Sequence, residues 1–359
     1  MRIEKIYKSR INKIDFNDIS FGNHYSDHML YCKFKNGKWE NPIIKPFGKI
    51  TVSPISLVFH YGQAIFEGMK AYKDKLENVF LFRPMENFNR MNSSAKRLKM
   101  PLISKSIFID GLKKLINLDK KWIPNNYGQS LYIRPFIIAS DGKLSANPSK
   151  KYIFMIICTP AKNYYSTPLK VKIEQKYSRS AEGGIGFTKA AGNYASSFYP
   201  TNIAQKEGYD QILWTDSSTH SFIEESGTMN VFFYIKDCLI TAPANEKILS
   251  GITRKSIITL AKEKGLKVKE CNLSVSELLY SFRKNLVKEV FGCGTAVVVN
   301  HFKQIGYKGK NYFLPKISSE KRISFFLKKR LLDIQHNVVD DPFGWRKKIN
   351  VLKKINGLT

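Results

Sequence analysis

Short apolar runs alternate with amphipathic segments along the chain, and this alternation constrains the fold more than any other feature. Ser130–Ala139 and Tyr152–Thr159 are extended apolar stretches of the kind that form buried strands. In Glu86–Leu98 the apolar residues recur at helical spacing instead, and Pro101 follows the segment. No apolar run reaches the ~18 residues that a membrane-spanning helix needs. The pattern therefore predicts a mixed fold of α/β and α+β type.

The chain is long enough for two domains. It has 359 residues, whereas a typical domain has ~150. A polar and aromatic stretch follows the second strong strand. We therefore expect a smaller N-terminal α/β domain at 1–163, a linker at 164–168 and a larger C-terminal domain at 169–359. The cleft between the two domains is the expected place for a functional site.

The second half of the chain repeats the mixture of strands and helices. Leu169–Glu174 is a predicted strand, and a Gly-rich segment follows it. Tyr194–Lys206 is a predicted helix that stops at Gly208, and Thr253–Lys264 is another. Leu286–Phe291 is a predicted strand that runs directly into the sequence GCGTA.

The net charge of +30, from 59 basic and 29 acidic residues, is the unusual number in the composition. Such a balance is typical of proteins that bind nucleic acid or acidic membranes. The basic residues are scattered along the whole chain, however, and no basic stripe alternates with aromatic residues. We therefore expect neither a specific nucleic-acid partner nor a membrane partner, and a basic nucleic-acid-binding protein stays a distant alternative.

The cysteines and the N-terminus indicate a cytoplasmic protein. The five cysteines are odd in number and form no CxxC motif, which favours a reducing compartment. The opening sequence MRIEKIYKSRINKIDF has no apolar core or small-residue cleavage site, so we expect no secretory signal. His24 and His28 lie four residues apart without an evident third ligand, and we expect no metal site.

Lys189 is the first candidate for chemistry. It lies in GFTKAAGNY, among small and apolar residues, whereas most lysines of the chain have polar neighbours. Small neighbours allow a bulky ligand to approach the backbone. A desolvated lysine loses its proton more easily and becomes a nucleophilic amine that can form a Schiff base with an aldehyde. On this residue alone, a lysine in a surface turn is the better interpretation.

Two further patterns fit a charged aromatic cofactor. Glu224 and Glu225 precede Ser-Gly-Thr at the entry to a strand, where a carboxylate could pair with a protonated ring nitrogen. Gly251 precedes a predicted helix whose first N–H groups suit an anion, and GCGTA offers a second backbone nest. Arg90, on a predicted helix, could add positive charge. A solvated acidic turn and ordinary helix caps are the alternatives.

Together these motifs resemble the branched-chain amino acid aminotransferases of pyridoxal phosphate (PLP) fold type IV, in their longer, eukaryotic-like subgroup. This class IV aminotransferase fold, also called D-amino acid aminotransferase-like, implies an active site in the inter-domain cleft and PLP as the cofactor. The resemblance covers nearly the whole chain. The motifs that carry it, in family order, are FGNHYSDHML, HYGQAIFEGMKAY, FRPMENFNRM, LYIRPF, GGIGFTKAAGNYASS, EESGTMN, LSGITRKS and VFGCGTA.

The resemblance implies a role for each matching residue. Lys189 would hold PLP as a Schiff base and move the proton, Tyr194 would bond the ring oxygen, and Glu225 would face the pyridine nitrogen. The remaining cofactor contacts that it implies are Arg90, Ile252, Thr253, Thr295 and, with a less direct match, Arg179. The substrate contacts that it implies are Phe21, Tyr61, Phe66, Tyr132, Arg134, Tyr164, Thr228 and Ala296.

The implied reaction is transamination of L-leucine, L-isoleucine and L-valine with 2-oxoglutarate, which gives branched 2-oxo acids and L-glutamate. Arg134 would meet the γ-carboxylate of glutamate. The family is usually homodimeric, with a partner loop that completes each site. Mammalian members carry a CxxC after the GTA motif, whereas this chain has Val297 and Asn300 there, so thiol regulation of that kind is not expected.

Two other fold type IV activities, D-amino acid aminotransferase and aminodeoxychorismate lyase, are the nearest alternatives. The length of the chain and the motifs EGMKAY, YIRP and GTMN argue against both.

Overall fold

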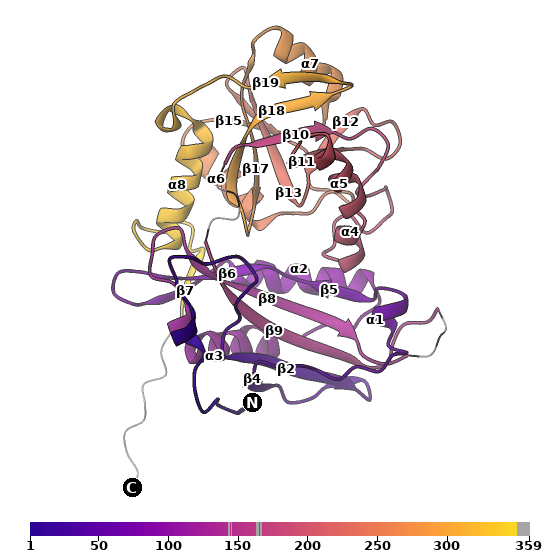
Figure 1. Ribbon diagram of the computed structural model, residues 1–359, viewed down its shortest axis with the longest axis vertical. Coiled ribbons are helices and arrows are strands. Elements are labelled where there is room, and N and C mark those ends of the chain that lie inside the picture. The colour runs from indigo at the N-terminus through magenta and orange to yellow at the C-terminus, as the bar shows by residue number, and fades with distance from the viewer. Residues whose placement is uncertain (143, 145, 163–164, 166, 350–359) are drawn as a thin grey trace.

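The computed structural model describes residues 1–142, 144, 146–162, 165 and 167–349. Tyr164 and part of the predicted linker therefore lie outside the described residues. Two lobes stack along the long axis of the molecule, and each is built around one mixed β-sheet (Figure 1). None of the helices in the described ranges is long and apolar enough to cross a membrane.

The first lobe is built on sheet A, which is antiparallel except for its β1–β4 pair. Burial alternates along the later residues of Ser130–Ala139, as expected for a strand with two different faces, whereas Met69–Lys73 and Val79–Phe82 are buried throughout. The main path of sheet A runs β1 (Arg2–Ile3), β4 (Ile43–Pro46), β2 (His28–Lys35), β9 (Tyr152–Ala161), β8 (Ser130–Ala139), β6 (Met69–Lys73), β7 (Val79–Phe82) and β20 (Arg346–Lys348). Two short strands lie off this path, β3 (Lys38–Trp39) on β2 and β5 (Ala64–Phe66) on β8.

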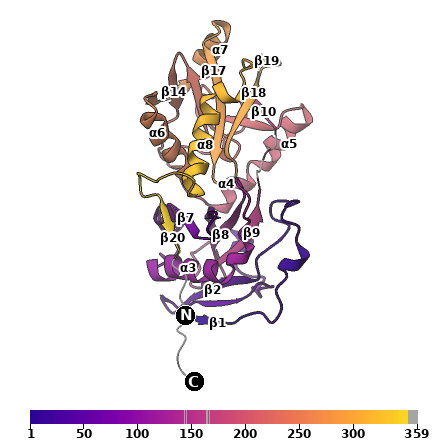
Figure 2. The ribbon, with the colours of Figure 1, turned by 90° about the vertical axis from the view of Figure 1, so that its left-hand side faces the viewer.

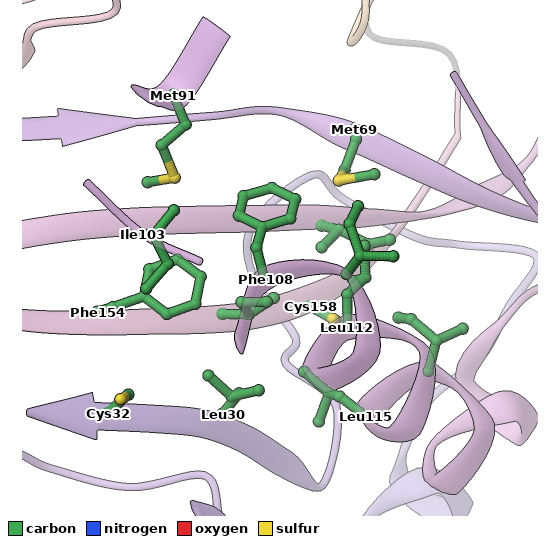
Figure 3. Close-up of a cluster of buried hydrophobic side chains, with 14 of the residues drawn as sticks. Leu30, Cys32, Met69, Met91, Ile103, Phe108, Leu112, Leu115, Phe154 and Cys158 are labelled. Atoms are coloured by element: carbon green, nitrogen blue, oxygen red, sulfur yellow. The ribbon is translucent and has the colours of Figure 1, made fainter. Parts of the chain in front are cut away.

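One face of sheet A packs against helices and forms the core of the first lobe. The helices are α2 (Pro84–Arg97), the π-helical segment Ser106–Asp110 and α3 (Gly111–Leu118), while the short α1 (Leu57–His60) lies near the end of β8. Figure 3 shows the helical side chains Phe108 and Leu112 packed against side chains from the strands. This apolar layer fixes α2, and with it Arg90, relative to the sheet.

The second lobe is a closed β-structure. Six strands pair in a ring, in which β13 is bonded to both β17 and β12. Apolar side chains from all six strands form its core. The ring runs β13 (Met229–Ile235), β17 (Val287–Gly294), β18 (Val298–Tyr307), β10 (Leu169–Ile173), β11 (Gln211–Thr215) and β12 (Phe222–Ser226). Around it lie β14 (Cys238–Thr241), β15 (Lys267–Glu270), β16 (Leu273–Ser274) and β19 (Lys310–Phe313).

Helices cover the outside of this ring, as Figures 1 and 2 show. α6 and α8 share an apolar cluster with the ring strands β17 and β18. α7 begins with a capping box, in which Ser274 and Glu277 bond each other's backbone N–H. The helices of the second lobe are α4 (Ala191–Ala195), α5 (Phe198–Lys206), α6 (Ile252–Glu263), α7 (Val275–Arg283) and α8 (Ile323–Gln335).

The predicted single helix Tyr194–Lys206 is wrong, because the structure has two helices there, α4 and α5. The hydroxyl of Ser197 donates to the carbonyl of Tyr194 and ends α4. Pro200 lies in the first turn of α5, where proline needs no N–H donor. Proline in the middle of one long helix would have removed a backbone bond, so the break could have been predicted.

The chain returns to sheet A after it has built the second lobe. Figure 2 shows β20 beside β7, and its register pairs Arg346 with Phe82. The backbone N–H of Arg83 donates to the carbonyl of Trp345, and its guanidinium lies 4.8 Å from the Trp345 ring centroid. The chain therefore passes between the two lobes twice. The boundaries proposed from the sequence, 1–163 and 169–359, stay predictions.

Candidate active site

A cavity of about 610 Å³ lies between sheet A and the ring of the second lobe. Strand β8 forms its wall through simple alternation, because neighbouring residues of a strand point to opposite faces. Tyr132, Arg134 and Phe136 line the cavity, whereas Leu131 and Ile133 belong to the core beneath it. The volume falls in the range of ~300–1,000 Å³ that small-molecule sites occupy.

Lys189 projects into this cavity from the segment just before α4. Its backbone N–H donates to the Ser94 hydroxyl, and its carbonyl accepts from the Phe66 N–H, so two elements of the first lobe hold it. Its Nζ donates to the Tyr194 phenol oxygen at 2.8 Å. In the described part of the chain, no carboxylate oxygen lies within ion-pair distance of this Nζ. The amine is therefore positioned but has no ionic partner.

Side chains alternate along a strand, so only one of the two adjacent glutamates can face the cavity. Glu225 on β12 lines the cavity, whereas Glu224 points to the other side, where Lys247 Nζ lies 3.5 Å from its carboxylate. Asn230 on the paired strand β13 donates to Glu225 Oε1 at 3.0 Å. Arg179 Nη1 lies 2.7 Å from Oε2, yet this buried oxygen accepts no hydrogen bond of regular geometry from the described residues. Glu225 is therefore a carboxylate at the cavity wall that Asn230 and Arg179 hold in place.

Burial raises the pKa of the Glu225 carboxyl above its ordinary value, and the Arg179 guanidinium offsets this only in part. A cationic N–H from a bound ligand would favour the charged carboxylate further. The site is thus complementary to a protonated ring nitrogen.

The side chain of Arg90 is only 11% exposed, although it lies on a helix. It forms a bidentate pair with Glu67, with Nε–Oε1 and Nη2–Oε2 distances of 2.7 and 2.9 Å. Asn87 donates to the same carboxylate at 2.7 Å. Burial alone would lower the pKa of Arg90, but the charge of Glu67 raises it above its ordinary value. Arg90 Nη1 also donates to the Ser250 carbonyl, which places the guanidinium at the start of α6.

The start of α6 forms an anion cradle, which we define as Gly251–Thr253 together with the turn Thr295–Val297. The first N–H groups of a helix have no intrahelical acceptor, and the helix dipole attracts negative charge there. Gly251 is the N-cap and has no side chain to fill this position. A Cβ there would collide with the side chain of Asn230, which is in contact with Glu225. Both parts of the cradle line the cavity.

The far side of the cavity is aromatic and contains one guanidinium. The rings of Phe21 and Tyr132 meet edge to face at 4.9 Å. Arg134 Nη2 donates to the Tyr132 phenol oxygen at 2.9 Å, and the guanidinium lies 4.6 Å from the Phe66 ring centroid. No ion pair joins Arg134 to a carboxylate of the described residues, and its Nε is buried without a hydrogen-bond partner. The pocket thus offers apolar walls and a positive charge that remains available to a ligand.

The structure brings most of the predicted site residues to this one cavity. Two are placed differently, and a third is not among the described residues. Arg179 contacts Glu225 and does not line the cavity. Tyr61, at the C-cap of α1, is 52% exposed and does not line it either. Tyr164 lies outside the described residues. The predicted residues that line the cavity are Lys189, Tyr194, Glu225, Arg90, Ile252, Thr253, Thr295, Phe21, Phe66, Tyr132, Arg134, Thr228 and Ala296.

Two residues that hold the site together were not predicted from the sequence. Glu67 neutralises Arg90, and Asn230 orients Glu225. The signal for Asn230 was its place five residues after Glu225, on the strand that returns beside it. Glu67 is 23 residues from Arg90, and no sequence spacing indicates their contact.

Comparison with known proteins places this fold and site in a class. The family model "Amino-transferase class IV" matches residues 64–305. A "Probable branched-chain-amino-acid aminotransferase" of Staphylococcus aureus (strain MRSA252) is 42% identical over 93% of this chain and 94% of its own length. "Branched-chain-amino-acid transaminase 1" of Bacillus subtilis is 39% identical over 93% of this chain and 95% of its own. The crystal structure of the Escherichia coli branched-chain amino acid aminotransferase has a TM-score of 0.72 at 26% identity, over 90% of this chain and 99% of that one.

The chain therefore belongs to the class IV aminotransferases, of PLP fold type IV. Within that class its relatives over nearly the full length are branched-chain-amino-acid aminotransferases, and the chain belongs to this group. The expectation of the family, the fold and the enzyme class is confirmed.

The residues of the cavity fit PLP, the cofactor of the class. Lys189 Nζ is positioned in the cavity for an aldehyde, and the Glu225 carboxylate at the cavity wall suits a protonated ring nitrogen. At the other end, Arg90 provides a guanidinium and the anion cradle provides free backbone donors, which suits a phosphate.

Proposed function

We propose that this chain transfers the amino group of L-leucine, L-isoleucine and L-valine to 2-oxoglutarate, with branched 2-oxo acids and L-glutamate as products. The observation that carries this proposal is the position of Arg134 in an otherwise aromatic wall. An apolar pocket accepts the branched side chains. The same pocket accepts glutamate because its γ-carboxylate can pair with the guanidinium. One extra or missing methylene group changes the binding free energy in an apolar pocket by only ~1–3 kcal/mol. All three branched substrates should therefore react.

Each side chain of the cavity has a separate role in the reaction. PLP, when bound, supplies the electron sink for the negative charge that develops at the substrate α-carbon. Lys189 Nζ is the base positioned to remove the α-proton and to return it, and no carboxylate of the described residues pairs with it. Glu225 favours a protonated ring nitrogen, and Asn230 keeps its carboxylate oriented. Arg90 and the anion cradle hold the phosphate, and this keeps the reacting atoms close to Lys189.

The experiment that tests the proposal is a spectrum and an assay on the purified protein. We expect a yellow protein whose absorbance changes when L-leucine is added, and glutamate formation from L-leucine and 2-oxoglutarate. A colourless protein that PLP cannot reconstitute would contradict the cofactor assignment. A yellow protein that forms no glutamate would contradict the substrate assignment, and D-alanine would then be tested as the donor.

We further propose that the enzyme is a homodimer. Exposed apolar side chains gather on and beside α1, where Ile55, Phe59 and Tyr61 are 46%, 63% and 52% exposed. Such a patch is typical of a surface that another chain covers. A partner chain placed there would explain why Tyr61, an expected substrate contact, does not reach the cavity of its own chain. Light scattering at the mass of a monomer, 41.3 kDa, would contradict this.

We also propose a cytoplasmic location. All five cysteines are free, and four of them are buried, which fits a protein that works in a reducing compartment.

A further inference from the structure

Lys70 is a buried lysine to which the proposed reaction assigns no role. It lies on β6, where Met69 and Ala71 point into the core of the first lobe. Because strand residues alternate, Lys70 and Tyr72 project from the opposite face, toward the second lobe, and Tyr72 packs in a cluster with α8. Only 4% of Lys70 is exposed. A lysine in this position is unusual because an isolated buried cation is unfavourable.

The surroundings of Lys70 do not neutralise it. Within the described ranges no carboxylate oxygen lies within 4.0 Å of its Nζ. The Nζ donates a hydrogen bond to the Ala296 carbonyl at 3.1 Å. The titratable groups that interact with it from this side are Lys328 on α8 and His336 at the C-cap of that helix, and both are bases. Burial, together with Lys328, lowers the pKa of Lys70 to about 7. An anion close by would restore the charged form.

That anion has an evident place, because Lys70 lies directly behind the anion cradle. A small second cavity, of about 20 Å³, is lined by Lys70 and also by Ile252, Thr253 and Thr295. The same three cradle residues line the main cavity on their other side. Lys70 does not line the main cavity, so a bound ligand is not expected to touch it.

The bond from Lys70 also fixes the direction of a peptide group. In a trans peptide the carbonyl of one residue and the N–H of the next point in opposite directions. The described residues contain no cis peptide bond. The Ala296 carbonyl points to Lys70, so the N–H of Val297 points away from Lys70. Without that bond, the turn Thr295–Val297 could rotate its peptide groups and lose its shape as a cradle.

We propose that Lys70 is a positioning residue that holds the turn Thr295–Val297 through the Ala296 carbonyl and lends the cradle a buried positive charge, and thereby strengthens binding of the cofactor phosphate. This inference rests on the proposed function, since it needs PLP in the main cavity. It adds a determinant of cofactor affinity that acts from behind the site.

The test compares three variants with the wild type. Lys70→Met removes the charge and the donor but keeps the apolar stem. Lys70→Arg keeps a cation and donors, and the small cavity beside it provides space. Lys73→Met is the matched control, because Lys73 is a buried lysine of the same strand that faces the other way and pairs with Glu77. The Kd of PLP is measured by equilibrium dialysis of the holoenzyme, and the Kd of pyridoxal, which has no phosphate, is measured beside it.

We expect Lys70→Met to raise the Kd of PLP roughly 10–100-fold, as for the loss of a hydrogen bond made by a charged group. The Kd of pyridoxal should change much less, Lys70→Arg should recover part of the loss, and Lys73→Met should bind PLP like the wild type. Lys70→Met should also unfold at the same or a higher temperature without cofactor, because it removes an unpaired buried cation.

The proposal would be overturned by an unchanged Kd of PLP in Lys70→Met. An equal loss of pyridoxal affinity, or an equal loss in Lys70→Arg, would also overturn it, because either result would assign the effect to packing. A wild type that binds no PLP would instead contradict the proposed function, so the two failures are distinguishable.

Discussion

The phenol oxygen of Tyr194 lies 2.8 Å from Nζ of Lys189, and Tyr194 follows Lys189 by five positions along the chain. Lys189 precedes α4 and Tyr194 lies within it, so one turn of helix places the hydroxyl against the amine. The same phenol ring packs edge to face on Phe66 from the first lobe, with centroids 4.7 Å apart. The contact therefore couples the proposed catalytic amine to both lobes.

Tyr194→Phe should keep the ring packing and remove only the hydroxyl. A neutral hydrogen bond contributes ~1 kcal/mol, and one to a charged group up to ~3 kcal/mol, so we expect kcat to fall roughly 10-fold. The absorbance maximum of the bound cofactor should shift as well, because the phenol lies at the amine that binds it. Steady-state kinetics with L-leucine and a spectrum of the holoenzyme measure both effects. An unchanged spectrum would remove Tyr194 from contact with the cofactor.

Lys189→Ala should abolish turnover and leave the protein folded. Its backbone bonds to Ser94 and Phe66 do not depend on the side chain, so the segment should keep its place. The measurement is glutamate formation, with circular dichroism as the control for folding. Activity above a hundredth of the wild type would show that another group moves the α-proton.

Glu225→Gln should bind PLP but react slowly. The amide cannot carry the negative charge that favours a protonated ring nitrogen, and we expect kcat to fall at least ~10²-fold, as for the loss of one preorganised charge or donor. Glu224→Gln is the matched control, because its side chain pairs with Lys247 outside the cavity. Single-turnover kinetics with L-leucine give the rate of proton removal. Equal rates in the two variants would contradict the role of Glu225.

Arg134→Met should weaken binding of 2-oxoglutarate much more than binding of L-leucine. The variant keeps an apolar side chain on the pocket wall but loses the charge that meets the γ-carboxylate. We expect KM for 2-oxoglutarate to rise roughly 10–100-fold, with KM for L-leucine changed less than threefold. L-Leucine serves as the internal control within the same variant. A parallel rise for both substrates would assign Arg134 to the shape of the pocket and not to specificity.

The stability of the protein should depend on His301 between about pH 6.5 and pH 4. Burial and the nearby cations Arg322 and Lys328 lower the pKa of His301 to about 4, from an ordinary value of 6.5. In that window the unfolded chain binds a proton that the folded chain does not, so stability falls as the pH decreases. His301→Asn should lose less stability between pH 7 and pH 5 than the wild type. Urea midpoints at the two pH values measure this, and equal losses would contradict the shift.

Strand and helix positions with strong periodicity could be predicted from the sequence, and contacts between distant segments could not. The predicted strand Ser130–Ala139 matches β8 residue for residue. The predicted helix Glu86–Leu98 begins two residues earlier, at Pro84, where the proline suits a first turn. The closure of six strands into a ring depends on the parallel pairing between β10 and β18, which lie far apart in the sequence, and no local pattern encodes that register.

In the site, too, contacts between distant segments could not be predicted. The resemblance to a known family predicted that Lys189, Glu225 and the start of α6 belong together, because their motifs occur in the order of that family. The sequence could not predict that Glu67 neutralises Arg90, since the pair forms only when α2 packs on sheet A. Nor could it show that Lys70 lies behind the cradle, because its acceptor is a backbone carbonyl 226 positions later.

The pairing of β20 with β7 has a consequence for the order in which the protein can be assembled during synthesis. β7 ends at Phe82, and its partner begins at Arg346. A ribosome adds ~5–20 residues per second, so the edge of sheet A has no partner for roughly 15–50 s after β7 emerges. An open strand edge of this kind is a template for pairing with other chains. Nascent chains are therefore vulnerable to aggregation in this interval, and a chaperone that covers the β7 edge would raise the yield of folded enzyme.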